Sequence, residues 1–347
     1  METLLRDRTV PARLERHLDR LTARRRGPGA PQIALRGPGV DSAYGDQETA
    51  FHAASIGKLF TGAIVMRLAA AGAFHLDARI DTLLPGDLLT GLFRDDMPSP
   101  TVLELLQHTS GAADYFEGRG RTSVLHELLA DPQRVWTPRE LLAFTRDRLR
   151  PVARPGERFH YSDTGFVLLG MLIEESTGLP FHEAVHAHVI EPLGLTRTFL
   201  PRLTTPAEGD ATLAPIMISG RDLSRVPGLS CAWAGGGVAS TTGDLLAFSE
   251  ALHDGRLVDA EHLRIMSTMR SRMRGGVHYG AAMMELRFEG FAPLLRGRSR
   301  PLGHLGSTGT SLFYDPASRI HVVMNFHSRS ELPRLIRTAI AIQTAMG

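Results

Sequence analysis

Cysteine is almost absent from this sequence. Cys231 is the only one in the chain, so the protein cannot form an intrachain disulfide or a cluster of thiolate ligands around a metal ion. No base stands beside Cys231 in the segment GLSCAWAGGG. We therefore expect a small buried residue at this position rather than a nucleophile.

Long apolar runs are also missing. The N-terminal segment METLLRDRTVPARLERHLDRL interrupts its apolar residues with charged ones every few positions, which argues against a secretory signal because such a signal needs a continuous apolar core. No stretch of the chain is long enough to span a bilayer. We expect a cytoplasmic protein with no membrane partner.

The chain carries little excess charge of either sign. Its formal net charge is +2, and its arginines are spread along the sequence instead of being collected in a basic tail. The densest basic run, TARRRG at 22–27, contains no aromatic residue. We interpret this run as a solvated face and expect no nucleic-acid partner.

Lysine is as rare as cysteine. The sequence contains 39 Lys and Arg residues, and Lys58 is the only lysine among them. Arginine supplies positive charge equally well but keeps its proton in proteins, whereas a buried amine can become neutral. A position that keeps lysine in an arginine-rich chain therefore suggests a need for a titratable amine.

Strand patterns lie toward both ends of the chain, and helical patterns lie between them. The segments APQIALRG and VDSAYGDQ, joined by a Gly-Pro-Gly turn, indicate a hairpin, and the last third of the sequence again becomes strand-like. We predict an α/β protein of the α+β type. Residues 1–80 together with 235–347 are expected to form a sheet domain, and residues 81–234 a mainly helical domain, with the active site between them.

Ser55 and Lys58 stand at the start of a predicted helix over 55–71. Three residues along a helix return to the same face, so the amine can reach the serine oxygen. The positive end of the helix favours a developing negative charge there, and a neutral amine can take the serine proton to make a nucleophile. The alternative is a serine that caps the helix, followed by a surface lysine.

Tyr161 lies in a second candidate segment, PGERFHYSDTGFVLLG at 155–170. It precedes an apolar helix, so its hydroxyl can project from a fixed helix start into a cleft. A tyrosine beside a lysine can act as a base or pass on a proton. The alternative is a tyrosine packed at a helix entry, with Ser162 or Asp163 as the cap.

His304 lies in a third candidate segment, GHLGSTGTSLFYDP at 303–316. On an edge strand, a His-x-Gly sequence points the imidazole outward and lets a substrate approach Gly306. The backbone N–H of Ser307 can then form an oxyanion hole together with that of Ser55. The alternative is a glycine-rich hairpin with an incidental histidine.

Together, Ser55-Ile56-Gly57-Lys58, Tyr161-Ser162-Asp163 and His304-Leu305-Gly306 resemble the Ser-x-x-Lys, Tyr-x-Asn and Lys-or-His-x-Gly motifs of the penicillin-recognising serine enzymes. The chain is most similar to the branch that contains class C β-lactamases, D-alanyl-D-alanine carboxypeptidases, esterases and transacylases. The segments LLQHTSG, EPLGL and GGGVASTTGDLLAF also resemble this family. The resemblance implies a β-lactamase/transpeptidase-like fold, with a central antiparallel sheet of about five strands, flanking helices and a helical insertion.

The resemblance also implies roles for the motif residues. Ser55 would be acylated, Lys58 would activate it, and Tyr161 would relay protons to the leaving group and from water. His304 would anchor the substrate or tune Tyr161. No cofactor or metal is implied, and His108 in QHTSG is interpreted as structural.

Two positions depart from the family pattern. His304 stands where β-lactamases of this branch usually have lysine, which makes a dedicated lactamase less favoured. Asp163 replaces the usual asparagine, and an ionised carboxylate can only accept hydrogen bonds. Asp163 would favour the ammonium form of Lys58, and we expect it to face a donor on a substrate that differs from penicillin.

Three functions remain open at this point. The first is a serine hydrolase that forms an acyl-enzyme on Ser55 and cleaves a small amide or ester, such as a D-configured peptide. The second is an acyltransferase or peptide cyclase that passes the same acyl group to an amine or alcohol. The third is a non-catalytic homologue that binds a ligand. The sequence leaves the acyl group, its stereochemistry, the acceptor and the oligomeric state open.

Overall fold

The computed structural model describes residues 10–23, 29–118 and 121–346. The arginines at 24–26 of the basic run lie outside these ranges, as do the first nine residues of the N-terminal segment. No helix among the described residues is long and apolar enough to cross a membrane.

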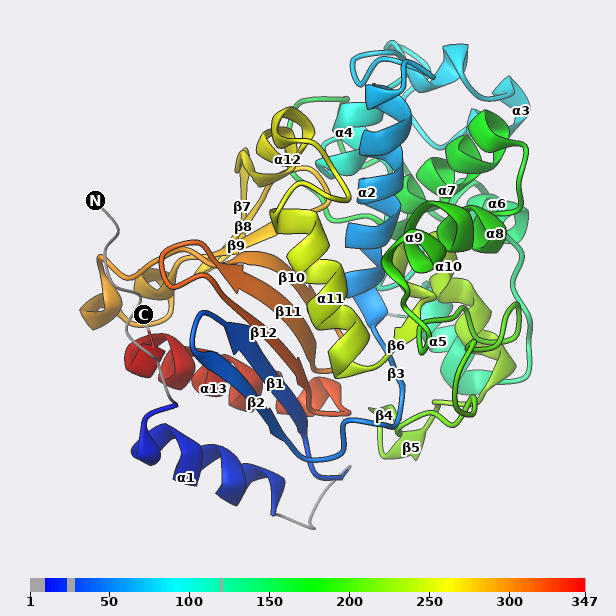
Figure 1. Cartoon of the computed structure of the whole chain (residues 1–347). Helices are drawn as coiled ribbons and strands as arrows, with labels where there is room; N and C mark the ends of the chain where they lie inside the picture. Colours follow the sequence, from blue (N-terminus) through cyan, green and yellow to red (C-terminus); the bar gives the residue numbers. More distant parts are fainter. Residues whose placement is uncertain (1–9, 24–28, 119–120, 347) are drawn as a thin grey trace.

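One antiparallel sheet of eight strands organises the fold (Figure 1), in the order β2-β1-β12-β11-β10-β9-β8-β7. The strands are β1 (Gln32–Gly37), β2 (Val40–Tyr44), β7 (Ser271–Arg274), β8 (Val277–Tyr279), β9 (Met284–Leu286), β10 (Leu302–Gly306), β11 (Thr310–Asp315) and β12 (Ile320–Asn325). The predicted hairpin is β1–β2, and Gly39 in its turn has a φ of 72°, a conformation that glycine adopts without steric cost.

The expected sheet of about five strands is extended by three more. β2, β1, β12, β11 and β10 make five, and the short strands β9, β8 and β7 continue the sheet beyond β10. Strands of three or four residues carry too little alternation to reveal from sequence whether they join a central sheet. The antiparallel sheet with flanking helices and a helical insertion is confirmed.

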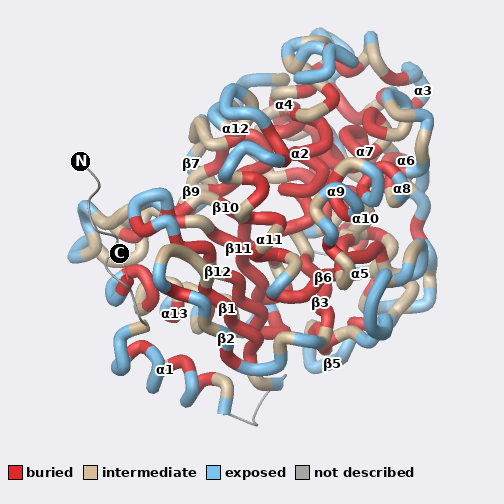
Figure 2. Tube along the Cα trace, in the orientation of Figure 1, coloured by how far each residue is buried: buried red, intermediate tan, exposed pale blue. Residues whose placement is uncertain are grey.

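Helices cover both faces of the sheet. On one face, α1 (Ala12–Thr22) and α13 (Leu332–Met346) bury Leu18 and Leu335 against Ile33. On the other face, α2 (Gly57–Ala70) and α11 (Thr242–His253) belong to the cluster that contains Ala34 and Val323. Successive side chains of β1 thus enter different cores, and Figure 2 shows the central strands buried between them.

The helical region continues from α2 on the side away from α13 (Figure 1). Its helices are α3 (Gly86–Leu89), α4 (Val102–Leu106), α5 (Val124–Ala130), α6 (Pro138–Arg148), α7 (Asp163–Thr177), α8 (Phe181–Val185), α9 (Glu191–Leu193) and α10 (Trp233–Gly236), while α12 (Ala260–Ser267) lies near α2. Capping boxes at Thr101 and Thr137 start α4 and α6, as the Thr-x-x-Glu spacing favours.

Short elements complete the chain. β3 (Phe51–His52) pairs with β6 (Ala239–Ser240), and β4 (Met217–Ile218) pairs with β5 (Arg221–Asp222). The division into domains 1–80 with 235–347 and 81–234 stays a prediction, because one hydrophobic cluster includes Phe60 of α2, Leu169 of α7 and Phe248 of α11.

Candidate active site

Ser55 lies in a tight turn at the entrance to α2. The turn, Ala54–Ile56, is a 3-10 helix that leads directly into α2, and Ser55 makes no capping hydrogen bond. Ala54 has a φ of 50°, which is unfavourable for a residue with a side chain. The surrounding structure holds this turn: Thr310 donates to the carbonyl of Ala53 at 3.0 Å, and the Ala53 N–H donates to Val238.

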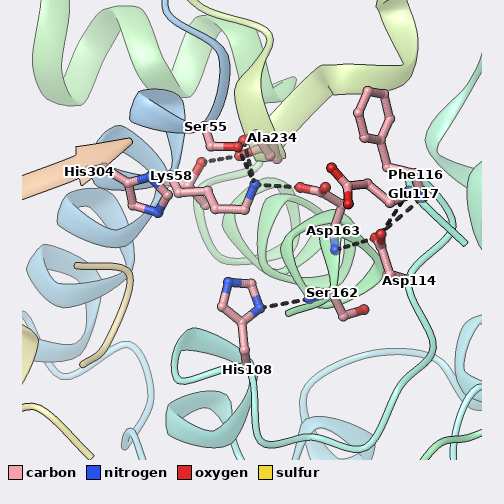
Figure 3. A network of polar contacts seen from close by, with 12 residues as sticks. Ser55, Lys58, His108, Asp114, Phe116, Glu117, Ser162, Asp163, Ala234 and His304 are labelled. Atoms are coloured by element: carbon pink, nitrogen blue, oxygen red, sulfur yellow. Dashed lines mark hydrogen bonds and ion pairs between the residues drawn. The ribbon is translucent and has the colours of Figure 1, made fainter. Parts of the chain in front are cut away.

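Lys58 is fully buried and donates to three acceptors. Its Nζ lies 3.5 Å from Ser55 Oγ and 2.8 Å from the carbonyl oxygen of Gly235, and it forms an ion pair with Asp163. Figure 3 shows the amine between these groups. Three acceptors match the three N–H donors of an ammonium group, so the geometry favours the charged form of Lys58.

The run Gly235–Gly237 makes room for this ion pair. A Cβ atom on Gly235 would lie 2.6 Å from Asp163 Oδ1 and 3.3 Å from Lys58 Nζ, and one on Gly236 would lie 2.9 Å from the backbone of Ala54. These are closer than side-chain carbons approach polar atoms or backbone. The glycines are therefore required by the approach of α10 to the start of α2.

Tyr161 and Asp163 reach the site from the start of α7. The Tyr161 ring centre lies 5.0 Å from Lys58 Nζ. Burial raises the pKa of the Tyr161 phenol well above its ordinary value, the negative charge of Asp163 raises it further, and a hydrogen bond with the Ser55 side chain opposes them. Ser55 therefore contacts both the lysine and the tyrosine that the sequence singles out.

Asp163 pairs with Lys58, in keeping with the expectation that it favours the ammonium form of the lysine. The sequence predicts a carboxylate that faces a donor on the substrate, but its Oδ1 accepts from Lys58. Its side chain keeps 13 % of its surface exposed and lines one of the cavities beside Ser55. A role for Asp163 in substrate binding stays a prediction.

His304 is fully buried behind the cleft, so the expected outward imidazole is wrong. β9 pairs with β10 only at Leu302 and Gly303, so the pairing stops before His304. The ring of Tyr279 packs edge-on against the His304 ring, with the two ring centres 5.7 Å apart. The Tyr279 hydroxyl lies 3.1 Å from His304 Nε2 and 3.1 Å from His108 Nε2. A catalytic role for His304 stays a prediction.

Proton positions in this buried network follow from one contact. His108 Nδ1 accepts from the Ser162 N–H at 3.1 Å, so the neutral His108 carries its proton on Nε2 and donates to Tyr279. Tyr279 then donates to His304 Nε2, and His304 Nδ1 donates to the carbonyl of Leu305 at 2.7 Å. Burial, followed by the charge of Lys58, lowers the pKa of His304 to about 3, in keeping with a neutral ring.

Two cavities meet at Ser55. The larger, about 940 Å³, includes Gly306 and Leu305 in its walls. The smaller, about 90 Å³, is an apolar pocket with mainly aliphatic and aromatic walls: Tyr115, Phe116, Leu125, Ile216, Ile218 and Leu229. Ser55, Tyr161 and Ser307 line both cavities, which places the backbone expected to form the oxyanion hole at their junction.

Asp114 is a polar residue of this region that the sequence did not reveal. Its side chain is buried and accepts from the N–H groups of Phe116, Glu117 and Asp163, as Figure 3 shows. Burial, followed by the charge of Asp163, raises the pKa of Asp114 to about 7. Its only signal in the sequence is an acidic residue between Ala113 and the aromatic Tyr115.

The described residues contain no cluster of three or more His, Cys, Asp or Glu side chains that could hold a metal ion. Cys231 is buried, and burial followed by the charge of Asp163 raises the pKa of its thiol. Its predicted role as a small buried residue agrees with this environment.

Comparison with known proteins decides the family. The profile of the Beta-lactamase family matches residues 14–345. The chain belongs to the Beta-lactamase family. A D-stereospecific amidohydrolase from Streptomyces sp. has the same fold, with a TM-score of 0.77 and 27 % identity over 94 % of this chain and 97 % of that one. The resemblance drawn from the three motifs is confirmed, and so is the predicted fold class.

Two curated relatives in this family match parts of the chain. Penicillin-binding protein 4 of Amycolatopsis lactamdurans is 28 % identical over 52 % of this chain and 42 % of its own length. Esterase EstB of Burkholderia gladioli is 34 % identical over 43 % of this chain and 38 % of its own length. Each match therefore spans less than half of the relative.

Proposed function

We propose that the protein is a serine hydrolase that forms an acyl-enzyme on Ser55 and cleaves a small amide or ester. The observation that carries this proposal is the convergence of Lys58 and Tyr161 on the Ser55 hydroxyl, at the junction of the two cavities. A hydroxyl between a cation and a phenol can be deprotonated as it attacks a carbonyl carbon.

Acylation begins with Ser55 Oγ attacking the carbonyl carbon while Tyr161 accepts its proton. Tyr161 acts here as the phenolate. Lys58, as the ammonium, stabilises this phenolate before the transfer and the negative charge that develops on Ser55 Oγ as its proton leaves. The N–H groups of Ser55 and Ser307 stabilise the carbonyl oxygen of the tetrahedral intermediate. Tyr161 then gives the proton to the leaving group, and the C–N or C–O bond breaks.

Deacylation follows the same path in reverse with water as the nucleophile. Tyr161 takes a proton from the water, the water oxygen attacks the acyl carbon, and the proton returns to Ser55 as the acid is released. Lys58 keeps its proton throughout, so Tyr161 is the residue that changes its protonation state. This assignment follows from the three acceptors around Lys58 Nζ.

The apolar pocket supports a substrate with an apolar group beside the scissile bond. The side chains of Tyr115, Phe116 and Leu229 line the pocket and can pack against this apolar group. The similarity to a D-stereospecific amidohydrolase supports amides of D-configured amino acids, and the similarity to EstB supports esters as well.

The test is covalent labelling followed by substrate profiling. A fluorophosphonate should add once, on Ser55, and Ser55→Ala should abolish labelling in intact-mass spectra. The labelled enzyme should lose activity toward p-nitrophenyl esters and D-amino-acid amides in proportion to its labelled fraction. Absence of any adduct from neutral to alkaline pH would instead support a ligand-binding homologue.

Acyl transfer is distinguished by its products. With a competing amine or alcohol present, a hydrolase releases mainly the free acid, whereas an acyltransferase gives mainly the new amide or ester. We expect the free acid, because the cavity of about 940 Å³ beside Ser55 has room for water.

A further inference from the structure

Asp114 joins two parts of the site that are far apart in the sequence. Its Oδ1 accepts from the N–H of Asp163 at 2.9 Å and of Phe116 at 3.2 Å, and its Oδ2 accepts from the N–H of Glu117 at 2.8 Å. Asp163 is the first residue of α7, whereas Phe116 and Glu117 form part of the apolar pocket. One buried carboxylate therefore holds both segments.

The carbonyl oxygen of Ala113 strengthens the same connection. It accepts from Ser162 Oγ at 2.9 Å and from Thr164 Oγ1 at 2.7 Å. Tyr115, the residue after Asp114, donates its hydroxyl proton to the carbonyl of Cys231 at 2.7 Å. We call residues 115–117 the pocket wall. The hydrogen bonds of Ala113 and Asp114 connect the pocket wall to the same turn of α7 that forms the ion pair with Lys58.

Only an acceptor suits the position of Asp114. All three of its hydrogen-bond partners are backbone N–H groups, which can only donate. An ionised carboxylate satisfies them all, but an asparagine would turn its NH₂ group toward one of them and leave that N–H without a partner. Asp114 would then lose its hydrogen bond either with Asp163 of α7 or with Phe116 or Glu117 of the pocket wall.

We propose that Asp114 is a positioning residue for substrate selectivity: by fixing the pocket wall against α7, it gives the enzyme its preference for apolar acyl groups over small ones. This inference rests on the proposed acyl-enzyme chemistry at Ser55. Asp114 acts through Phe116 and Glu117 and takes no part in bond breaking. The preference comes from a wall that is already in place when the acyl group binds.

The test compares two esters in the wild type and in Asp114→Asn. For the p-nitrophenyl ester of 3-phenylpropionic acid we expect KM to rise at least about 5-fold, because the phenyl group uses the pocket wall. For p-nitrophenyl acetate we expect kcat/KM to change less than about 2-fold, because acetyl does not reach the wall. An unchanged ratio between the two esters, or an equal loss on both, would overturn the proposal.

Asp131→Asn is the matched control. Asp131 also accepts a backbone N–H, that of Gln133 at 3.1 Å, but it is exposed and lines neither cavity. Both esters should behave as in the wild type. Should Asp114→Asn fail to fold, Thr164→Val removes the hydrogen bond from α7 to Ala113, together with the contact between the Thr164 and Thr145 hydroxyls, while keeping the shape of the side chain. It should shift the ester ratio in the same direction.

A binding measurement separates this inference from the proposed function. Calorimetry with the amide of 3-phenylpropionic acid uses a Ser55→Ala background, in which no chemistry is needed. Adding Asp114→Asn should weaken binding at least about 5-fold. A wild type that hydrolyses neither ester would refute the hydrolase proposal alone. Equal affinity of Ser55→Ala with and without Asp114→Asn would refute the role of Asp114.

Discussion

Replacing Asp163 with asparagine should move the acidic limb of the pH–rate profile. The negative charge of Asp163 is the second cause, after burial, of the raised pKa of Tyr161. Asparagine keeps the size of the side chain and removes the charge, so the phenolate becomes easier to form. The expected change is a fall in the pKa of Tyr161, because the largest of the charges that raise it is removed.

The sign of the rate change follows from the role of Tyr161 as proton acceptor. Below the pKa of the phenol, the deprotonated fraction rises tenfold for each unit by which the pKa falls. In Asp163→Asn the acidic limb of kcat/KM should therefore shift to lower pH, and the rate at neutral pH should increase. The assay is hydrolysis of a p-nitrophenyl ester between pH 5 and 10.

The same substitution should reduce stability. Lys58 is fully buried and Asp163 is its ionic partner, so asparagine leaves an uncompensated ammonium in the interior. Breaking a buried pair in this way costs about 3 to 5 kcal/mol. Urea denaturation at pH 7 measures the loss and shows whether the variant is folded under the assay conditions.

Glu117→Gln is the control for the rate effect. It also removes one negative charge from the cleft, but Glu117 is solvated, pairs with Arg329 at 2.8 Å and is the smallest of the named causes of the Tyr161 shift. The acidic limb of Glu117→Gln should move much less than that of Asp163→Asn. The reasoning is refuted if Asp163→Asn leaves the limb in place, or if Glu117→Gln moves it equally far.

Three further predictions concern the surroundings of Ser55. Lys58→Arg should lower kcat/KM by at least about 10³-fold and abolish fluorophosphonate labelling, because a guanidinium does not fit the fully buried site of the amine; labelling at the wild-type rate would contradict this. Gly235→Ala should reduce activity by at least about 10-fold, since its Cβ would lie 2.6 Å from Asp163 Oδ1, whereas Gly243→Ala, which meets only Thr241 Oγ1 at 3.9 Å, should be active. A histidine has an ordinary pKa of 6.5, and His304 has a folded-state pKa of about 3, so the unfolded chain binds the proton first and stability is lost as pH falls from 6.5 toward 3. Thermal melts should show that His304→Gln loses about 2 kcal/mol less stability than the wild type between pH 7 and 5. Equal losses of stability in the two proteins would contradict the buried neutral histidine.

Local patterns were enough to predict many elements of the fold. The turn at 37–39 gives the β1–β2 hairpin, and the helix predicted over 55–71 is observed as the turn Ala54–Ile56 followed by α2, Gly57–Ala70. These features depend on neighbours in the sequence. The number of strands in the sheet did not follow, because β9 pairs with β10 through residues 17 and 19 positions apart, Glu285 with Leu302 and Met284 with Gly303.

The same distinction between local and long-range information applies to the candidate site. Ser55, Lys58 and Tyr161 were predictable because motif spacing carries them, and their convergence is now seen in the structure. The burial of His304 was not predictable, since it depends on which segments pack over this residue. Asp114 was missed altogether, because its partner in α7 is 49 residues away.

The solitary lysine has a consequence for how the protein can be handled. Lys58 is the only side-chain amine in the chain, and none of it is accessible to solvent. Reagents that modify lysine, such as succinimidyl esters and aldehyde cross-linkers, should find no side-chain amine to attack on the folded protein. Reaction at Lys58 would therefore report that the core around α2 has opened, which makes acylation by such reagents a sensitive probe of unfolding.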